Sequence, residues 1–288
     1  MYSKLLLFGF ILTLIFTVGC SHSSNASQSD NSEIVTSSTE KISQADRVSQ
    51  DDSDFTVLKT VSILYVGNSF VYTGEVPRQV EKLAIMYGIE TLHYSIAPGG
   101  ATLADTKTQA IDAMRGRKFD YAVFQDYGGR QLDGRNFAND VKELCDVAKE
   151  TGATPVLYNP AFSNVDGKPD KESQALLTDG YEKEALLNGA ILVNAADAWI
   201  YAYDKLPDIS LYNTGDYHAN SEGAYLTACV FASTLLNLHI KDISEWNLYS
   251  GKDAIPLGEA AWEFVTYYKA NGELPTVTVP TAPAKTKK

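Results

Sequence analysis

Cysteine and histidine are scarce in this chain, with three and four residues respectively among 288. Cys145 and Cys229 both lie in apolar, helix-like segments, and neither has a cysteine or histidine nearby at the spacing of a zinc site. We therefore expect both to be small core residues rather than nucleophiles, and the sequence does not require a disulfide between them. Glycines form no phosphate-binding motif in the right context, so neither a metal nor an organic cofactor is expected.

Positive charge is also in deficit. The chain has 24 Lys and Arg against 36 Asp and Glu, which gives a formal net charge of −12. A protein that binds a phosphate backbone needs basic side chains to neutralise it. The balance argues against nucleic acid as a partner.

The one long apolar run, residues 5–18, is shorter than the roughly 20 residues that a membrane-spanning helix needs. Lys4 precedes the run, and Gly19 and Cys20 follow it, which is the order of a secretory signal. The four residues that end at Cys20 resemble a bacterial lipobox, with Thr17 where leucine is more usual. This resemblance implies cleavage before Cys20, lipid attachment to its thiol, and an extracytoplasmic protein anchored to a bacterial membrane. An ordinary secretory signal or an uncleaved anchor is the alternative.

The composition divides the rest of the chain into three parts. Residues 20–54 contain eleven serines and hardly any aromatic residues, so they cannot bury enough apolar surface to offset the entropy of ordering and are predicted to be a disordered tether. Residues 55–274 are numerous enough for one domain with a core. Residues 275–288 are predicted to be a disordered tail.

Strand-like and helix-like apolar patterns alternate along residues 55–274. Strands are expected at residues 61–66, 91–97, 121–126, 155–158 and 191–194. Helices are expected at residues 76–87, 103–115, 137–149, 171–187, 197–203, 221–236 and 257–270, the last covering an edge of the sheet. Alternating strands and helices pair in parallel through right-handed crossovers. The sequence therefore predicts a flavodoxin-like, three-layer α/β/α sandwich around a five-stranded parallel sheet.

A serine follows the first expected strand. That strand stops at Gly67, which gives the backbone freedom to turn, and Ser69 lies just beyond it. In an open α/β sheet this end of a strand is where ligands bind, which makes Ser69 a candidate nucleophile. The alternative is a strand-to-helix loop in which Asn68 and Ser69 are turn or cap residues.

Three further residues, Gly100, Gln125 and His218, support the interpretation of Ser69 as a nucleophile. Gly100 and Gln125 lie at or just after the ends of the second and third expected strands, so parallel pairing brings them to the same sheet edge as Ser69. His218 precedes a helix that should pack beside the first strand, which makes it the best general base among the four histidines. On its own, His218 fits a solvated loop residue equally well.

In order and spacing, the blocks at residues 67–70, residues 100–102, Gln125 and His218 resemble the SGNH or GDSL-type serine esterases and acylhydrolases. Most of that family has asparagine where this chain has Gln125. In this respect the chain resembles a branch of the family that has glutamine at this position. The resemblance implies that Ser69 is the nucleophile and His218 its base. It also implies an oxyanion hole made of the backbone N–H groups of Ser69 and Gly100 and the side-chain amide of Gln125.

The position of the aspartate that would orient His218 departs from the family pattern. The family usually places an aspartate three residues before the histidine, where this chain has Gly215. Asp216 lies two residues before His218 and orients the imidazole only if the loop bends differently. Either Asp216 or a main-chain carbonyl group therefore holds His218.

The resemblance implies an ester hydrolase that acts on a small acyl ester or an acylated carbohydrate. Acetyl is the expected acyl group, because the chain shows no large apolar lid insertion of the kind that a lipase would use. A lipase or thioesterase is one alternative. A non-catalytic carbohydrate-binding or surface-interaction lipoprotein on the same scaffold is another, motivated by the position of Asp216.

Residues around the expected third-strand loop have weaker interpretations. Asp126 and Arg130 are more simply a charge pair in a solvated loop than substrate contacts. Tyr127, Tyr212 and Tyr217 could form an aromatic wall for a sugar ring, although tyrosine is abundant in this chain, with 17 residues.

Overall fold

The computed structural model describes residues 59–126, 136–162, 164–241, 253–273 and 275. All of them belong to one unit of the chain, Asp52–Lys288. The expected signal peptide with Cys20 and the tether lie outside the described residues, as does nearly all of the expected tail, so these boundaries stay predictions. Within the ranges described, no helix has both the length and the apolar character that crossing a membrane requires.

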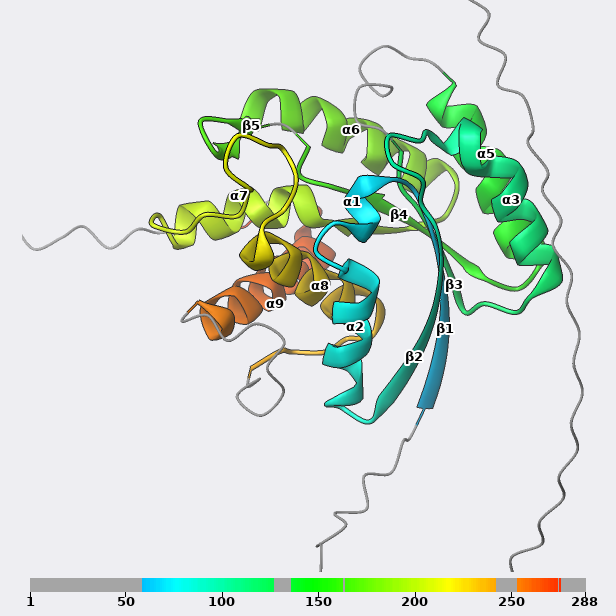
Figure 1. The fold of residues 1–288 in the computed structure, drawn as a ribbon, viewed down its shortest axis with the longest axis horizontal. Coiled ribbons are helices and arrows are strands. Elements are labelled where there is room, and N and C mark those ends of the chain that lie inside the picture. Colours follow the sequence, from blue (N-terminus) through cyan, green and yellow to red (C-terminus); the bar gives the residue numbers. More distant parts are fainter. Residues whose placement is uncertain (1–58, 127–135, 163, 242–252, 274, 276–288) are drawn as a thin grey trace, which may run out of the picture. The chain divides into compact units, whose positions relative to one another are not determined.

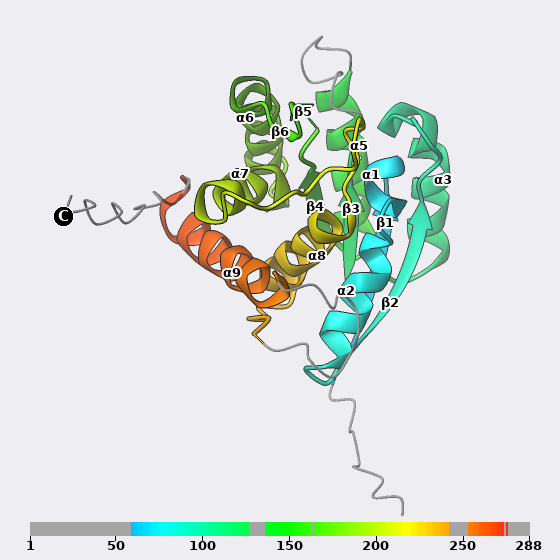
Figure 2. The same cartoon turned by 60° about the vertical axis from the view of Figure 1, so that its left-hand side comes forward.

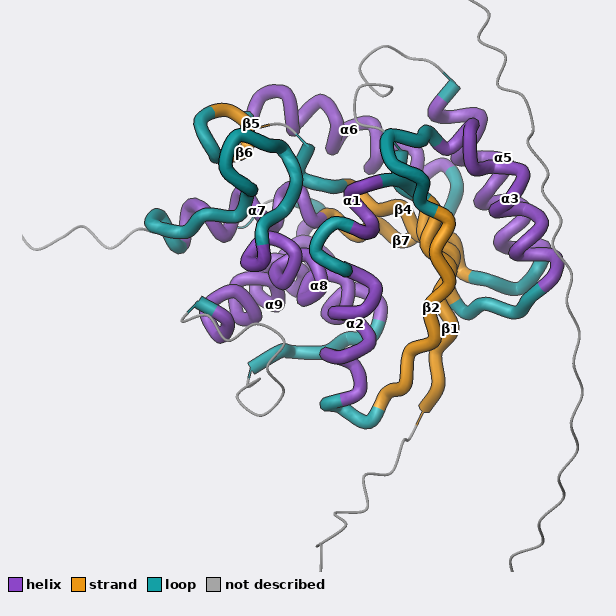
Figure 3. Tube along the Cα trace, viewed as in Figure 1, coloured by secondary structure: helices purple, strands orange, loops and turns teal. Residues whose placement is uncertain are grey.

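The centre of the fold is a five-stranded sheet with the order β2-β1-β3-β4-β7. Its strands are β1 (Lys59–Val66), β2 (Ile89–Ile96), β3 (Tyr121–Phe124), β4 (Thr154–Asn159) and β7 (Ile191–Asn194). All four neighbouring pairs are parallel. The predicted parallel α/β sheet is confirmed, and Figures 1 and 3 show its twist.

Helices cover both faces of this sheet. They are α1 (Ser69–Tyr72), α2 (Val76–Ile85), α3 (Leu103–Gly116), α5 (Phe137–Glu150), α6 (Lys171–Leu187), α7 (Ala195–Lys205), α8 (Ser221–Leu235) and α9 (Ala254–Asn271). One core cluster joins the sheet to α2, α7, α8 and α9, and a second joins it to α3, α5 and α6. Figure 2 shows α3 and α9 on opposite sides of the sheet, which confirms the three layers. Helix α9 packs mainly on α7 and α8, and beside the edge strand β7 it lines a cavity of about 180 Å³.

The sequence of β1 explains why it lies inside the sheet. Ile63 and Tyr65 enter the core cluster beneath α8, whereas Leu64 and Val66 enter the cluster on the opposite face. Alternating side chains of a strand point to opposite faces, so a strand buried on both sides must be apolar throughout. The Tyr65 ring meets Phe231 of α8 with 5.7 Å between centroids, so α8 packs against the first strand as the sequence predicts.

Two short elements are absent from the expectations. Helix α1 has only four residues, and the hairpin of β5 (Asn164–Val165) and β6 (Lys168–Pro169) has two residues in each strand. Elements of this length are too short to produce a periodic pattern. The hairpin does carry a local signal, because its turn is Asp166-Gly167 and both residues have positive φ, 52° and 77°, as a type I′ turn requires.

Candidate active site

Ser69, His218 and Asp216 form a continuous chain of hydrogen bonds. The Oγ atom of Ser69 lies 2.7 Å from Nε2 of His218. On the other side of the ring, Nδ1 of His218 lies 2.9 Å from both carboxylate oxygens of Asp216. The structure therefore brings together three side chains separated by up to 149 positions of sequence, in the arrangement of a nucleophile, a base and an orienting acid.

Asn68 fixes the position of Ser69 at the start of α1. Its side chain is fully buried; Oδ1 accepts a hydrogen bond from the backbone N–H of Phe70, and Nδ2 donates to the carbonyl group of Ala101 at 2.9 Å. The residue is thus the helix cap that the simpler interpretation expects. It also ties the Ser69 turn to the loop after β2, a role that only tertiary contacts reveal.

Gln125 is fully buried and also holds the turn that carries Ser69. Its Oε1 accepts a hydrogen bond from the backbone N–H of Asn68 at 3.0 Å, and its Nε2 donates to the carbonyl group of Asp126. Both ends of the amide therefore bind the protein's own backbone. This geometry gives Gln125 a positioning role, and its role as an oxyanion donor stays a prediction.

The two glycines of the site are required for different structural reasons. A Cβ atom on Gly67 would lie 2.5 Å from Oε1 of Gln125, and Gly67 is not among the residues with positive φ. Gly67 therefore gives space to Gln125 rather than freedom to the backbone. Gly100 has φ of +70°, and a Cβ there would meet no protein atom within 4 Å, so its backbone conformation is what favours glycine. Gly100 is exposed after the end of β2.

Asp126 is not part of a solvated loop. The interpretation as a solvated residue is wrong for Asp126, because this residue is fully buried. Its Oδ1 accepts a hydrogen bond from the backbone N–H of Leu103 at 3.3 Å, at the amino end of α3, and its own N–H donates to the hydroxyl group of Tyr181. Helix amino ends carry unsatisfied N–H groups and a partial positive charge, which explains a carboxylate there. Arg130 lies outside the described residues.

The expected aromatic wall is only partly supported. Tyr212 belongs to the core, since its ring packs edge-on against Trp199 at 4.8 Å and burial raises the pKa of its hydroxyl group. Tyr212 therefore exposes too little of its surface to form a wall for a sugar ring. Tyr217 is 42% exposed, and its ring centroid lies 4.6 Å from that of His218. Tyr127 lies outside the described residues.

Phe162 is a site residue that the sequence does not single out. Its ring lies 5.5 Å from that of Tyr217 and 5.6 Å from that of Phe70, and Phe70 in turn lies 5.3 Å from His218. The available signal was its position, three residues after the end of β4 and thus at the same sheet edge as Ser69. Phe70, Phe162 and Tyr217 form an aromatic cluster beside the histidine.

A tight loop carries Asp216 and His218. Tyr212 and Ala219 form an antiparallel bridge at its base, and the N–H of Asn213 donates to the carbonyl group of His218 at 3.0 Å. Gly215 has φ of +75°, a conformation that glycine adopts without strain. This bend brings a carboxylate only two positions away onto the imidazole.

The charge of Asp216 is stabilised in this loop. Partial burial raises the pKa of its carboxyl group, but hydrogen bonds from the His218 ring and from the backbone N–H of Tyr217 outweigh burial and bring the pKa below its ordinary value. The group is therefore a carboxylate at neutral pH. A carboxylate at Nδ1 fixes the tautomer that leaves Nε2 free to take a proton from Ser69.

The two cysteines in the described part of the chain are structural. Cys145 and Cys229 are buried and free, and burial raises the pKa of each thiol to about 12, so the prediction of core residues is confirmed. Across the described ranges, no group of three histidine, cysteine or carboxylate side chains could hold a metal ion.

Comparisons with known proteins identify the fold. No family model matches the chain, and no curated protein matches it in sequence. A solved structure assigned to the SGNH hydrolases, from Slackia heliotrinireducens, aligns with a TM-score of 0.50 and 24% identity, covering 61% of this chain and 99% of that one. A DUF4886 family protein from Bacteroides uniformis aligns with a TM-score of 0.58 and 18% identity, covering 75% of this chain and 97% of that one. The chain has the α/β fold of these proteins, which is the fold of an SGNH hydrolase.

Proposed function

We propose that this protein is a serine ester hydrolase in which Ser69 is the nucleophile, His218 the general base and Asp216 the residue that orients His218. The observation that carries the proposal is the continuous hydrogen-bonded chain from Ser69 Oγ through His218 to Asp216, with distances of 2.7 and 2.9 Å. Distances of this size are those of an activated nucleophile, its base and the group that orients the base.

The geometry gives a two-step reaction. Oγ of Ser69 attacks the ester carbonyl carbon while its proton moves to Nε2 of His218. The tetrahedral intermediate then releases the alcohol, which takes that proton, and leaves an acyl group on Ser69. A water molecule repeats the sequence on the acyl-enzyme, giving its proton to Nε2 and releasing the acid.

The oxyanion of the intermediate requires hydrogen-bond donors at the same sheet edge. We assign this role to the backbone N–H groups of Ser69 and Gly100, which follow the ends of β1 and β2, and to the side-chain amide of Gln125. Since both ends of the Gln125 amide bind backbone groups in this structure, the two backbone donors are the principal candidates. One such donor is typically worth about 3 to 4 kcal/mol of activation free energy.

The side of the site behind His218 is closed to an acyl chain. Behind His218, a cavity lined by Phe70, Tyr158, Trp199 and further core residues offers only about 10 Å³. That volume is about the minimum needed for one water molecule, so a long acyl chain has no room on this side. We propose an acetyl ester of an extracellular carbohydrate as the substrate, rather than a lipid or a thioester of a long-chain acid.

The contact between Asp216 and His218 removes the motive for a non-catalytic role, because that alternative depended on the unusual spacing of the aspartate.

We retain from the sequence the proposal that Cys20 is lipidated and that the protein is held outside the cytoplasm on a bacterial membrane. A labelled fatty acid should be incorporated into the wild-type protein but not into a Cys20→Ser variant, and absence of label from the wild type, or equal labelling of the two, would contradict the proposal.

The Ser69→Ala variant tests the function. It should lose hydrolysis of p-nitrophenyl acetate while retaining its circular dichroism spectrum and melting temperature. Ser221→Ala is the matched control, since Ser221 is an exposed serine at the start of α8 whose hydroxyl group bonds Glu222. Full activity in Ser69→Ala would refute the proposal.

A further inference from the structure

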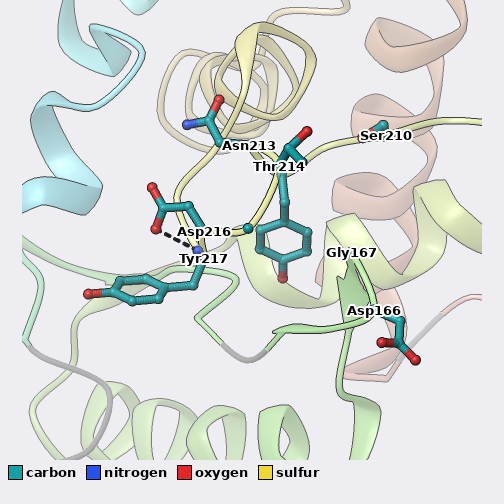
Figure 4. A pocket seen from close by; sticks show the side chains of 9 residues that line it. Asp166, Gly167, Ser210, Asn213, Thr214, Asp216 and Tyr217 are labelled. Atoms are coloured by element: carbon teal, nitrogen blue, oxygen red, sulfur yellow. Dashed lines mark hydrogen bonds between the residues drawn. The ribbon is translucent and has the colours of Figure 1, made fainter.

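A second cavity lies on the other side of the loop that carries His218. It has a volume of about 580 Å³ and lies between the β5–β6 hairpin and the loop of residues 210–217 (Figure 4). This volume is within the range of about 300 to 1,000 Å³ that small-molecule sites occupy. Its lining residues are Asp166, Gly167, Ser210, Tyr212, Asn213, Thr214, Gly215, Asp216 and Tyr217. We call it the loop cavity.

Hydrogen bonds connect the two walls of the loop cavity. The hydroxyl group of Tyr203 donates to the carbonyl group of Gly167 at 2.8 Å and accepts from the backbone N–H of Leu211 at 3.0 Å. Tyr203 therefore ties the hairpin to the loop. Tyr212 is buried against the core, and its hydroxyl group donates to the carbonyl group of Ala161. The cavity is thus a formed feature of the fold.

The chemistry of the lining selects a class of ligand. The carboxylate of Asp166 and the hydroxyl group of Thr214 line the cavity, together with the Asp216 carboxylate, which binds His218, and the Asn213 amide, whose Nδ2 donates to the carbonyl group of Ala219. None of the lining residues that the structure describes is lysine or arginine. A carboxylate such as that of Asp166 disfavours an anionic ligand, whereas it accepts hydrogen bonds from hydroxyl groups. The exposed ring of Tyr217 adds a flat apolar surface that can cover a ring face. Figure 4 shows Asp166 and Tyr217 at opposite ends of the group of lining side chains, with the Tyr217 ring directed away from Asp166.

Tyr217 and Asp216 connect the loop cavity with the catalytic histidine. Both residues line the cavity, and both also contact His218, Asp216 by a hydrogen bond of 2.9 Å and Tyr217 by a ring contact of 4.6 Å. A ligand in the cavity therefore lies against the same loop that holds the base. A chain of sugar units could occupy both places at once.

We propose that the loop cavity binds a neutral sugar unit of the carbohydrate that carries the ester, next to the unit whose acyl group reaches Ser69. This inference rests on the proposed function, since it assigns a subsite to the same substrate. Asp166 and Asn213 bind the sugar hydroxyl groups, and Tyr217 covers one face of the ring.

Binding to the Ser69→Ala protein tests the subsite without any reaction. We would titrate this full-length variant with the β-linked tetrasaccharides of glucose, xylose, mannose and N-acetylglucosamine, and with tetragalacturonate as the anionic probe, using isothermal titration calorimetry. At least one neutral probe should bind more tightly than tetragalacturonate. Failure of every neutral probe to bind at millimolar concentration, or tighter binding of the anion, would overturn the proposal.

Two further variants locate the binding. Asp166→Gly removes the carboxylate and keeps a residue that tolerates the positive φ of the turn, and Tyr217→Ala removes the ring. Each should raise the dissociation constant of the neutral probe about tenfold, which is the usual effect of losing one good contact. Asp112→Ala, at an exposed aspartate on α3, is the matched control and should change nothing. Equal affinity in all three variants would show that the sugar binds elsewhere.

A kinetic comparison separates this inference from the proposed function. In the active protein, Asp166→Gly should raise KM for an acetylated tetrasaccharide several-fold more than KM for p-nitrophenyl acetate, which has no sugar to occupy the cavity. An equal change for the two esters would contradict the subsite and leave the esterase intact. Hydrolysis that persists in Ser69→Ala would refute the esterase mechanism, whatever the binding measurements give.

Discussion

Asp216 binds the Nδ1 atom of His218 with both carboxylate oxygens, although only Tyr217 separates the two residues in the sequence. The backbone N–H of Tyr217 also donates to Oδ1 of Asp216 at 2.7 Å, so the carboxylate is held from two sides. Gly215 provides the turn that makes this geometry accessible. A triad can therefore form with an aspartate two residues before the histidine instead of three.

Replacing Asp216 tests whether it orients the base. Asp216→Asn should lower kcat for p-nitrophenyl acetate by about 10³-fold or more, because an amide at Nδ1 favours the tautomer that cannot take the proton of Ser69. The measurement is the initial rate at neutral pH, with Asp208→Asn, an exposed aspartate outside the loop, as control. A loss smaller than about tenfold would mean that a main-chain carbonyl group holds His218.

Gln125 should matter for stability as well as for rate. Gln125→Ala leaves the buried N–H of Asn68 without its acceptor and removes one of the two donors to the carbonyl group of Asp126, the other being the hydroxyl group of Tyr181. We expect the free energy of unfolding to fall by about 2 kcal/mol, measured by urea denaturation. Gln109→Ala on the exposed surface of α3 should change it by less than about 0.5 kcal/mol. If Gln125→Ala destabilises no more than Gln109→Ala, Gln125 does not hold the Ser69 turn.

A pair of glycine substitutions tests the packing at Gly67. Alanine at Gly67 would bring its Cβ within 2.5 Å of Gln125 Oε1 and 2.8 Å of Val71 Cγ2, so we expect a loss of about 1 to 3 kcal/mol of stability together with reduced activity. Alanine at Gly116, the last residue of α3, meets no atom within 4 Å and should be neutral or stabilising. Thermal unfolding of both variants is the measurement. A Gly67→Ala variant as stable as Gly116→Ala would contradict the contact.

The raised pKa of Asp197 predicts how the free energy of unfolding changes with pH. Burial raises the pKa of its carboxyl group from 3.8 to about 6, although hydrogen bonds from Asn194 and Thr178 partly oppose burial. The folded protein therefore holds this proton more tightly than the unfolded chain. The resulting stabilisation is complete below the pKa of the unfolded chain and is lost as the pH rises through about 6.

The Asp197→Asn variant lacks this titration. The stability of the wild type relative to Asp197→Asn should fall by about 2.5 kcal/mol between pH 4 and pH 8, since a shift of one pKa unit corresponds to about 1.4 kcal/mol and part of the effect is already lost at pH 4. Urea denaturation at several pH values measures the difference. Two parallel stability profiles would show that Asp197 does not titrate in this range.

Periodicity accounts for much of the fold that the sequence predicts. The apolar run that becomes β1 reflects the burial of that strand on both faces. The bounds of α6 agree with the prediction at both ends, although Leu176, Leu186 and Leu187 of this helix are exposed. Parallel pairing then brings Ser69 and the ends of β2 and β3 to one edge. These features depend on local pattern and on topology, both of which a single sequence contains.

The residues that the sequence interprets wrongly depend on contacts between distant segments. Asp126 is buried because the amino end of α3 lies above it, and Tyr212 is buried because Trp199 packs on it. Phe162 reaches Tyr217 across 55 positions of sequence, which no local pattern records. Gly67 lacks a side chain because of Gln125, again a tertiary contact.

Labelling of the active serine tests the central claim most directly. A fluorophosphonate probe should form one covalent adduct on wild-type protein, and mass spectrometry of the digested protein should locate it on Ser69. Ser221→Ala should label like the wild type, whereas Ser69→Ala should not label and His218→Ala should label far more slowly. An adduct on any other residue, or undiminished labelling of Ser69→Ala, would contradict the assignment of Ser69 as the nucleophile.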